Sequence, residues 1–238
     1  MSPASGTRGP ALPPAQWEDL VERTVALPGR DVVLLHPRDS VDLLDEDAFE
    51  REEFLPYWAE LWPSAIALAR AVVPAPPASP APPLPVAGRR VLELGCGLGL
   101  PSIAAALAGA EVLATDWSPD AVAFVAENAR RNGAALDTLV SDWADPETLP
   151  ALGPWDLVLA SDCLYERRNI DQLLVLIPEL VGDGGELWLS DPGRPQTDRF
   201  LTAFERDWER RSERVRDPEV SLHRLRRRPR AGKMLRED

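Results

Sequence analysis

The chain has 238 residues, of which 45% are hydrophobic, and a formal net charge of -13 at pH 7. This length and apolar fraction suit one buried core better than two. Proteins that bind phosphate backbones need a basic face, so the acidic balance excludes nucleic acid as an expected partner. The basic run at 223–230 is interpreted as a solvated terminal strand rather than as a phosphate site.

The few cysteines and histidines indicate a reducing compartment and no metal centre. Cys96 and Cys163 are not spaced as a disulfide framework. With only two histidines there is no His/Cys cluster for zinc. The start of the chain lacks the pattern of a signal peptide, and no apolar run reaches the roughly 18 residues of a membrane span. We therefore expect a soluble, cytoplasmic monomer with no membrane partner.

The first third of the chain precedes the regular part of the sequence. Residues 1–14 are small and Pro-rich, and we expect a disordered tail. Residues 15–238 are expected to form one domain, with an N-terminal helical extension over 15–73 and a Pro-rich surface loop over 74–85. Three elements are expected in the extension: an amphipathic helix over Gln16–Ala26, a strand over Asp31–His36 and a helix over Ser64–Val73.

From residue 89 onward, short β-rich runs alternate with helical stretches. Apolar runs of this length, separated by helices, are typical of strands buried on both faces of a parallel sheet. The strands are expected at 90–94, 111–116, 138–142, 156–161 and 186–191. The pattern predicts an α/β, doubly wound, Rossmann-like fold with ligands at the carboxyl ends of the strands.

Several helices between these strands have clear limits. Ser118 can cap a helix that ends at Asn132-Gly133. A helix over Pro101–Ala108 follows the first strand directly. Near the C-terminus, a helix over Thr197–Arg210 precedes two polar stretches that are expected to form a closing antiparallel hairpin, at Glu213–Arg216 and Val220–Arg226.

A glycine-rich turn follows the first strand. Gly95, Gly97 and Gly99 form G-x-G-x-G around Cys96, with Glu93 two residues ahead of the first glycine. Glycines allow a sharp turn and a close approach to a ligand at the start of a helix. Dinucleotide folds use G-x-G-x-x-G to hold a pyrophosphate. An acid beside the turn would repel a pyrophosphate and suits a ligand with an ammonium group, such as S-adenosylmethionine.

The next two strands also end in acids. Asp116 lies 21 residues after Gly95, where a carboxylate can accept both hydroxyls of a ribose. A role as helix cap is less suited to it, because Ser118 fills that role. Asp142 and Trp143 end the third strand and offer an acceptor for an adenine amino group and a flat wall beside the base. Together these residues predict a cofactor site at one edge of the sheet.

Three further segments resemble a known family. The segment 57–63 (YWAELWP), the segment 161–165 (SDCLY, with a D-x-x-Y motif) and the segment 191–195 (DPGRP) are similar to those of class I, seven-stranded S-adenosylmethionine-dependent methyltransferases. Within that class they resemble the lysine methyltransferase-like family, which has nicotinamide-methyltransferase-like relatives. The segment 191–195 is similar to the branch of the electron transfer flavoprotein β-subunit lysine methyltransferases.

The resemblance implies a role for each matching residue. Trp62 would flank the cofactor, Gly95, Cys96 and Gly97 would hold its methionine portion, Asp116 its ribose and Trp143 its adenine, while Ser161 would contact it through the backbone. Asp162 and Tyr165 would line the acceptor side. A carboxylate such as Asp162 favours an ammonium, so we assign it to positioning of a lysine rather than to proton removal. A structural role for Asp162, as a helix cap or as the ion-pair partner of Arg167 or Arg168, stays open.

The expected activity is therefore N-methylation of a protein lysine, and the alternative is methylation of a small molecule at nitrogen or oxygen. Two other classes are also open. A nicotinamide-dependent oxidoreductase would carry G-x-G-x-x-G, which is absent. An inactive binding module would lack some of the acids or glycines at the strand ends, and all of them are present.

Overall fold

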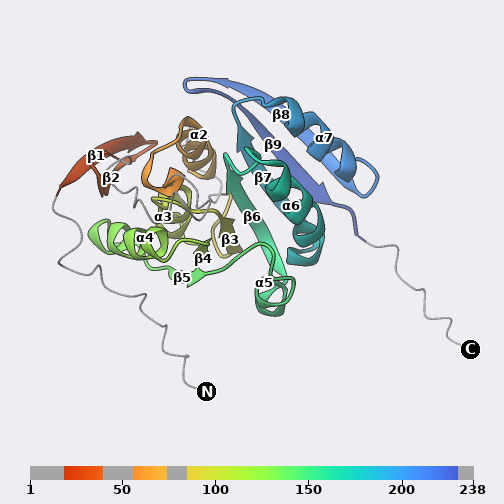
Figure 1. The fold of residues 1–238 in the computed structure, drawn as a ribbon, viewed down its shortest axis with the longest axis horizontal. Helices are drawn as coiled ribbons and strands as arrows, with labels where there is room; N and C mark the ends of the chain where they lie inside the picture. The colour runs from red at the N-terminus through yellow and green to blue at the C-terminus, as the bar shows by residue number, and fades with distance from the viewer. Residues whose placement is uncertain (1–18, 40–55, 74–84, 230–238) are drawn as a thin grey trace, which may run out of the picture.

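A computed structural model describes residues 19–39, 56–73 and 85–229 (Figure 1). The expected tail at 1–14 and almost all of the Pro-rich loop at 74–85 lie outside these ranges. Within them, no helix is long and apolar enough to cross a membrane.

The core of the molecule is one seven-stranded sheet with the strand order β5-β4-β3-β6-β7-β9-β8. Its strands are β3 (Arg90–Leu94), β4 (Glu111–Asp116), β5 (Asp137–Val140), β6 (Trp155–Ser161), β7 (Val181–Asp191), β8 (Trp208–Arg216) and β9 (Glu219–Arg227). The first five strands in this order pair in parallel, whereas β9 pairs antiparallel with both β7 and β8. The expected doubly wound sheet with a C-terminal antiparallel hairpin is confirmed.

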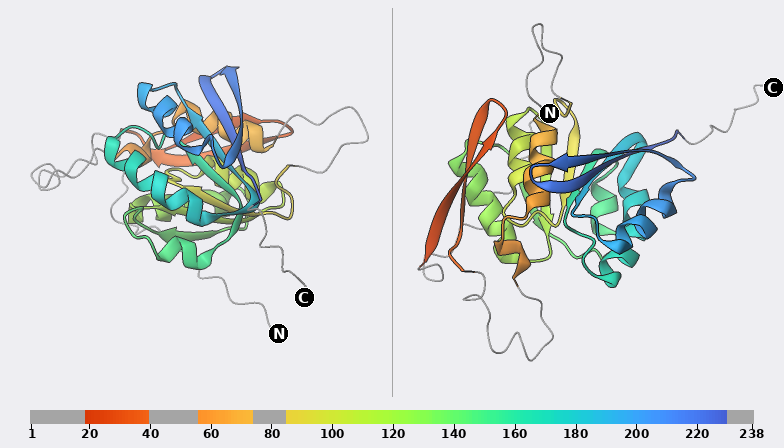
Figure 2. Two further views of the ribbon diagram at one scale, coloured as in Figure 1. Left: turned by 90° about the vertical axis from the view of Figure 1, so that its right-hand side faces the viewer. Right: turned by 90° about the horizontal axis from the view of Figure 1, so that it is seen from above.

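Helices cover both faces of the sheet (Figures 1 and 2). One face carries α2 (Pro63–Val72), α3 (Leu100–Leu107) and α4 (Pro119–Arg131), and the other carries α5 (Thr148–Leu152), α6 (Arg167–Leu180) and α7 (Pro195–Phe204). Side chains alternate along each strand, so Leu157 and Leu159 of β6 enter the first core, and Val158 and Ala160 enter the second. Burial on both faces explains why these strands read as continuous apolar runs.

The expected limits of α4 are confirmed at both ends. Ser118 is the N-cap, and its hydroxyl accepts a hydrogen bond from the backbone N–H of Ala121 at 3.3 Å. Pro119 occupies the first helical position, where a missing N–H costs nothing. The chain then turns at Gly133, whose φ of 67° lies in the left-handed region that glycine adopts without strain.

The expected helix over Thr197–Arg210 is wrong in its second half. Helix α7 ends at Phe204, and β8 begins at Trp208. Trp208 is buried against Phe204, with 5.3 Å between the ring centroids, while most of the charged residues that follow are exposed. The segment forms the edge strand of the sheet, where charged side chains are common and give no helical or strand-like apolar pattern.

The basic run at 223–230 is not a solvated terminal strand. Its first part lies in β9, between β7 and β8, and His223 and Leu225 are buried there. Two of its arginines stack on tryptophans instead of facing water alone: Arg224 lies 4.8 Å from the ring of Trp188, and Arg227 lies 5.9 Å from that of Trp208.

The expected helix over Gln16–Ala26 is also wrong where the structure describes it. Strands β1 (Leu20–Leu27) and β2 (Arg30–Pro37) form a separate antiparallel hairpin. Val25 and Leu27 are buried, whereas Thr24 and Ala26 are exposed, which is the period of a strand rather than of a helix. The turn at Pro28-Gly29, with a Gly29 φ of 80°, closes the hairpin. The strand expected at Asp31–His36 is confirmed as β2.

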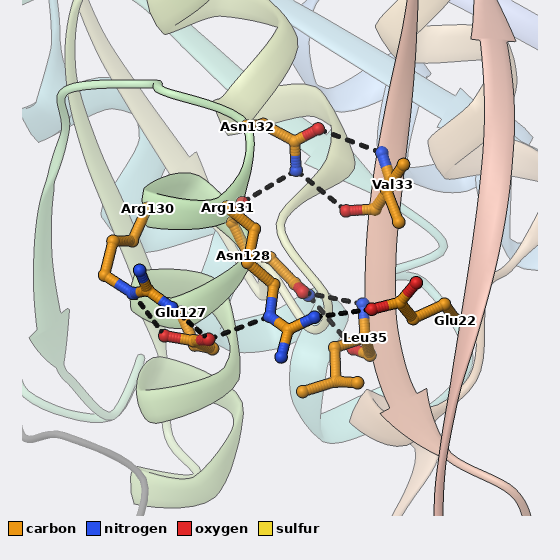
Figure 3. Close-up of polar contacts among 8 residues, drawn as sticks. All are labelled: Glu22, Val33, Leu35, Glu127, Asn128, Arg130, Arg131 and Asn132. Atoms are coloured by element: carbon orange, nitrogen blue, oxygen red, sulfur yellow. Dashed lines mark hydrogen bonds and ion pairs between the residues drawn. The ribbon is translucent and has the colours of Figure 1, made fainter.

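Two asparagines, Asn128 of α4 and Asn132 at its C-cap, attach this hairpin to the domain (Figure 3). The side-chain amide of Asn132 accepts from the N–H of Val33 at 2.9 Å and donates to its carbonyl at 2.7 Å. Asn128 does the same for Leu35, at 2.7 Å and 3.1 Å. Four residues of a helix rise about 6 Å and two residues of a strand span about 6.7 Å, so the two amides match alternate residues of β2.

We expect Asn128→Ala to lower the free energy of unfolding by about 1–3 kcal/mol, because it leaves the N–H and the carbonyl of Leu35 without their partner. Urea unfolding would measure this loss. Arg130→Ala, on the exposed side of the same helix, is the matched control and should leave the midpoint nearly unchanged. Equal midpoints for the wild type and Asn128→Ala would show that the amide adds nothing to the attachment.

Candidate cofactor and acceptor site

A cavity of about 630 Å³ opens at the carboxyl ends of β3, β4, β5 and β6. The short helix η2 (Tyr57–Ala59) and the start of α6 also contribute to its wall. Binding sites of doubly wound sheets lie at this edge, and the volume is typical of a pocket for a small organic ligand. Ten of the eleven residues predicted for the site line the cavity: Trp62, Gly95, Cys96, Gly97, Asp116, Asp142, Trp143, Ser161, Asp162 and Tyr165. The exception is Glu93.

The glycine turn forms the floor of the cavity. Gly95, Gly97 and Gly99 all have positive φ, between 50° and 80°. A Cβ at Gly97 would lie 3.1 Å from the carbonyl oxygen of Trp58, and one at Gly99 would lie 1.7 Å from Cγ2 of Val125. Glycine is therefore required here both by backbone conformation and by space.

Asp116 ends β4 inside the cavity and is almost fully buried. Its Oδ2 accepts from the N–H of Gly97 and its Oδ1 from the N–H of Ser118, both at 3.0 Å. Burial raises the pKa of this carboxyl, and the backbone N–H groups of Gly97, Ser118 and Trp117 oppose that rise. A carboxylate has about four lone-pair sites, so part of its acceptor capacity remains for a ligand. This capacity fits a pair of ribose hydroxyls.

Glu93 lies beneath the glycine turn and not in the wall of the cavity. The side chain is fully buried, and its Oε2 accepts from both the N–H and the hydroxyl of Ser102, in the first turn of α3. Burial raises the pKa of Glu93 to about 8. Its structural effect is to hold the start of α3 against β3, and a direct contact with a bound ligand stays a prediction.

Asp142 and Trp143 lie beyond the end of β5, because this strand ends at Val140. The Oδ1 of Asp142 accepts from the N–H of Ala144 at 2.8 Å and so fixes a tight turn. The turn brings the ring of Trp143 over the glycine floor, where a Cβ on Gly95 would lie 3.1 Å from it. The ring and the floor form two walls of the same part of the cavity.

Aromatic side chains form the rim. Tyr57 lies edge-on to Trp62, with 6.1 Å between ring centroids, and edge-on to Tyr165, at 5.5 Å. The indole N–H of Trp62 donates to the carbonyl of Tyr57 at 2.8 Å, which fixes the ring. Each of the three rings is more than a third exposed, so the rim offers apolar surface to a ligand.

Asp162 lies in the cavity wall directly after the end of β6. It is the one residue other than glycine with positive φ in the described part of the chain, at 58°, a conformation that marks many functional sites. Its carboxylate forms an ion pair with Arg194. The sequence had suggested Arg167 or Arg168 as its ion-pair partner. That suggestion is wrong, since Arg167 pairs with Asp171 and Arg168 pairs with Glu166.

Ser161 and the two cysteines lie close to the floor. Cys96 and Cys163 are free and buried, and burial raises the pKa of both thiols well above the usual value, so both stay protonated. The thiol of Cys163 donates to the carbonyl of Leu94 at 3.4 Å and so connects the ends of β6 and β3.

Sequence reasoning missed several residues of the wall. Tyr57 and Trp58 belong to the aromatic segment ahead of β3, in which only Trp62 was given a role. Arg194 lies in the loop after β7, which was recognised without a role for any single residue. The cluster of aromatic residues ahead of β3 was the signal in the sequence that could have identified Tyr57. Nothing in the spacing of Arg194 and Asp162 indicated that they pair.

Solved structures share this fold. The chain aligns with the T. thermophilus 16S rRNA N2 G1207 methyltransferase (RsmC), solved in complex with AdoMet and guanosine, at a TM-score of 0.65 and 17% identity, over 92% of this chain and 52% of that one. It aligns with the N-methyltransferase NodS of Bradyrhizobium japonicum, in complex with S-adenosyl-L-homocysteine, at a TM-score of 0.53 and 18% identity. This alignment covers 80% of this chain and 93% of that one. The fold is that of the Rossmann-like methyltransferases.

Sequence comparison narrows the class. Residues 57–207 match the family model described as lysine methyltransferase, so the chain belongs to that family. Over 144 residues it is 37% identical to the electron transfer flavoprotein beta subunit lysine methyltransferase of Danio rerio. The aligned residues cover 59% of this chain and 52% of that protein. It is also 37% identical to protein N-lysine methyltransferase METTL21A of Danio rerio, over 48% of this chain and 55% of that protein. The chain thus matches about half the length of these curated relatives.

The buried Glu93 makes stability depend on pH. Its pKa rises from 4.5 in the unfolded chain to about 8 in the folded protein, so between these values the folded protein keeps a proton that the unfolded chain releases. Relative to Glu93→Gln, the wild type should lose about 1.4 kcal/mol of unfolding free energy for each pH unit over this window. Urea unfolding at several pH values would measure the difference. The exposed control Glu111→Gln should show no such trend, and a flat difference for Glu93→Gln would contradict the prediction.

Proposed function

We propose that this protein is an S-adenosylmethionine-dependent methyltransferase and that its acceptor is a lysine side chain of another protein. The observation that carries the proposal is the arrangement of the cavity within a lysine methyltransferase family fold: a glycine floor, the buried Asp116 carboxylate with acceptor capacity left for a ligand, and a separate wall around Asp162. The cofactor would bind on the side of the floor and the acceptor on the side of Asp162.

The charges around the floor fit this cofactor. The carboxylates of Asp116 and Asp142 line this part of the cavity, and the cationic side chains of the described wall, Arg168 and Arg194, come from the β6 and β7 side instead. A pyrophosphate would meet carboxylates there, whereas a ligand with an ammonium and a sulfonium would be attracted. The residues present therefore favour S-adenosylmethionine over a dinucleotide.

Each part of the cavity has a role in this proposal. Asp116 would accept the ribose hydroxyls, and Trp143 with Asp142 would hold the adenine. The backbone of Gly95–Gly97 and of Ser161 would hold the methionine portion, and Trp62 would cover it. When bound, S-adenosylmethionine supplies a methyl group on a positively charged sulfur. The protein aligns the acceptor with that methyl and excludes water from the space between them.

The acceptor side suits a long, narrow side chain. Tyr57 and Tyr165 are exposed at the rim, and Asp162 lies deeper, almost fully buried. The methylene chain of a lysine could pass between the rings while its nitrogen approaches Asp162. The acidic net charge of the chain also favours encounter with a basic segment of a partner protein.

We expect Asp116→Asn to weaken binding of S-adenosylhomocysteine by about 5- to 150-fold, or ~1–3 kcal/mol, because the amide offers one acceptor oxygen fewer and no charge to the ribose. Titration calorimetry would measure the affinity. Asp120→Asn, exposed at the start of α4, is the matched control and should bind as the wild type does. Unchanged affinity of the Asp116 variant would remove this residue from the site.

A lysate of the source organism, incubated with the enzyme and radiolabelled S-adenosylmethionine, should yield a labelled protein band whose hydrolysate contains methyllysine. Asp162→Asn should lower the turnover at least tenfold and leave cofactor affinity unchanged, because Asp162 acts on the acceptor side. Label recovered only in a small metabolite would overturn the lysine proposal in favour of a small-molecule acceptor.

A further inference from the structure

Arg194 joins two carboxylates at the wall of the acceptor side. Its NH1 lies 2.8 Å from Oδ2 of Asp191, and its NH2 pairs with Oδ1 of Asp162. The side chains of Asp162 and Asp191 are 9% and 0% exposed, and that of Arg194 is 24% exposed, so the cluster is largely removed from water. Exposed ion pairs contribute little, but a pair with this burial is only weakly screened.

Asp191 fixes the position of the guanidinium. Its Oδ1 accepts from the N–H groups of Gly193 and Arg194, at 2.7 and 2.8 Å, and from the hydroxyl of Thr197, at 2.8 Å. Asp191 is not part of the cavity wall, whereas Arg194 and Asp162 both are. Asp191 thus acts as an anchor, and the arginine presents its charge to Asp162 at the edge of the cavity.

The other ionisable groups nearby do not replace this arginine. Nine of them line the same cavity: Tyr57, Glu60, Cys96, Asp116, Asp142, Cys163, Tyr165, Glu166 and Arg168. Glu166 and Arg168 lie 3.7 Å apart and offset each other. Cys163, beside Asp162, is a protonated thiol because burial raises its pKa. Behind the cluster, burial lowers the pKa of His223 of β9, which favours its neutral form, and Arg214 of β8 lies against Gly193.

The charge of Asp162 presents a chemical conflict for a lysine acceptor. Only a neutral amine has the lone pair that attacks the methyl carbon, and a free carboxylate beside the nitrogen would favour the ammonium form. A lysine ammonium has a pKa near 10.4 in water, so without help the reactive form is rare at neutral pH. A positive charge at the carboxylate reverses this bias.

We propose that Arg194 controls the protonation state of the acceptor amine: by pairing with Asp162 it leaves the carboxylate able to accept a hydrogen bond from the nitrogen but unable to hold it as an ammonium. The inference rests on the proposed lysine methyltransferase function. The ammonium first loses a proton to water. The lone pair then forms the N–C bond as the C–S bond breaks and its electron pair moves to sulfur, and the methylated ammonium later releases a second proton if it is methylated again.

The sign of the effect follows from the charges. Removal of Arg194 raises the pKa of the bound acceptor, so turnover should begin to rise at a higher pH. A neighbouring charge at this range shifts a pKa by about 1–3 units, and we expect the midpoint of the kcat profile to move upward by about one unit or more in Arg194→Met. The profile of kcat/KM reports the free reactants and should keep its midpoint.

The test is the pH dependence of kcat, measured at saturating concentration with the acceptor protein that the labelled band identifies, prepared in its unmethylated form. Arg194→Lys keeps a positive charge and should return the midpoint toward the wild-type value. Asp162→Asn combined with Arg194→Met removes both charges and should do the same, although at lower turnover. Arg199→Met removes one charge from the exposed side of α7 and should leave the profile unchanged. Calorimetry with S-adenosylhomocysteine checks that each variant is folded, and Arg194→Gln serves if the methionine variant is not.

Equal loss of kcat at every pH, with the midpoint unmoved, would assign Arg194 to anchoring of the loop alone and overturn this inference while the proposed function stands. A wild type that labels no protein would overturn the proposed function, and the assignment of Arg194 with it.

Discussion

The turn from β3 into α3 leaves no room for side chains, and three other parts of the molecule pack against it because of this. Val125 of α4 occupies the space of a side chain at Gly99, the backbone of Trp58 lies against Gly97, and the ring of Trp143 lies over Gly95. A loop that close-packed cannot be rebuilt one residue at a time. The floor of the cavity, its aromatic rim and the wall formed by Trp143 are therefore fixed by one backbone path.

The charges of the site follow the order of the strands. Carboxylates end the strands on one side of the glycine turn, and the buried pair of Asp162 and Arg194 lies at the ends of β6 and β7 on the other. A parallel sheet brings these ends to one edge, although the residues lie up to about a hundred positions apart in the chain. The topology of the sheet thus separates a half of the cavity that is lined by carboxylates from a half in which negative charge is compensated by an arginine.

The sequence was sufficient for the parallel strands, the glycine turn and the acids at the strand ends, because burial on both faces and sharp turns restrict residue types strongly. It was not sufficient for β1 and the first half of β8, which lie at sheet edges and whose exposed faces carry no regular apolar pattern. The ion pair of Asp162 with Arg194 was missed for a related reason, since it joins two loops. The direction of Glu93 was within reach: period two places it on the same face as Val91, beneath α3.

The amide ladder between α4 and β2 has a consequence for association between chains. A strand edge with free N–H and carbonyl groups can recruit a strand from another molecule. At Val33 and Leu35 of β2 those groups are already bound by Asn132 and Asn128, so two side chains of a helix take the place of a neighbouring strand. The hairpin remains two-stranded and still presents no open edge at these positions, which protects a small, separate sheet from templating aggregation.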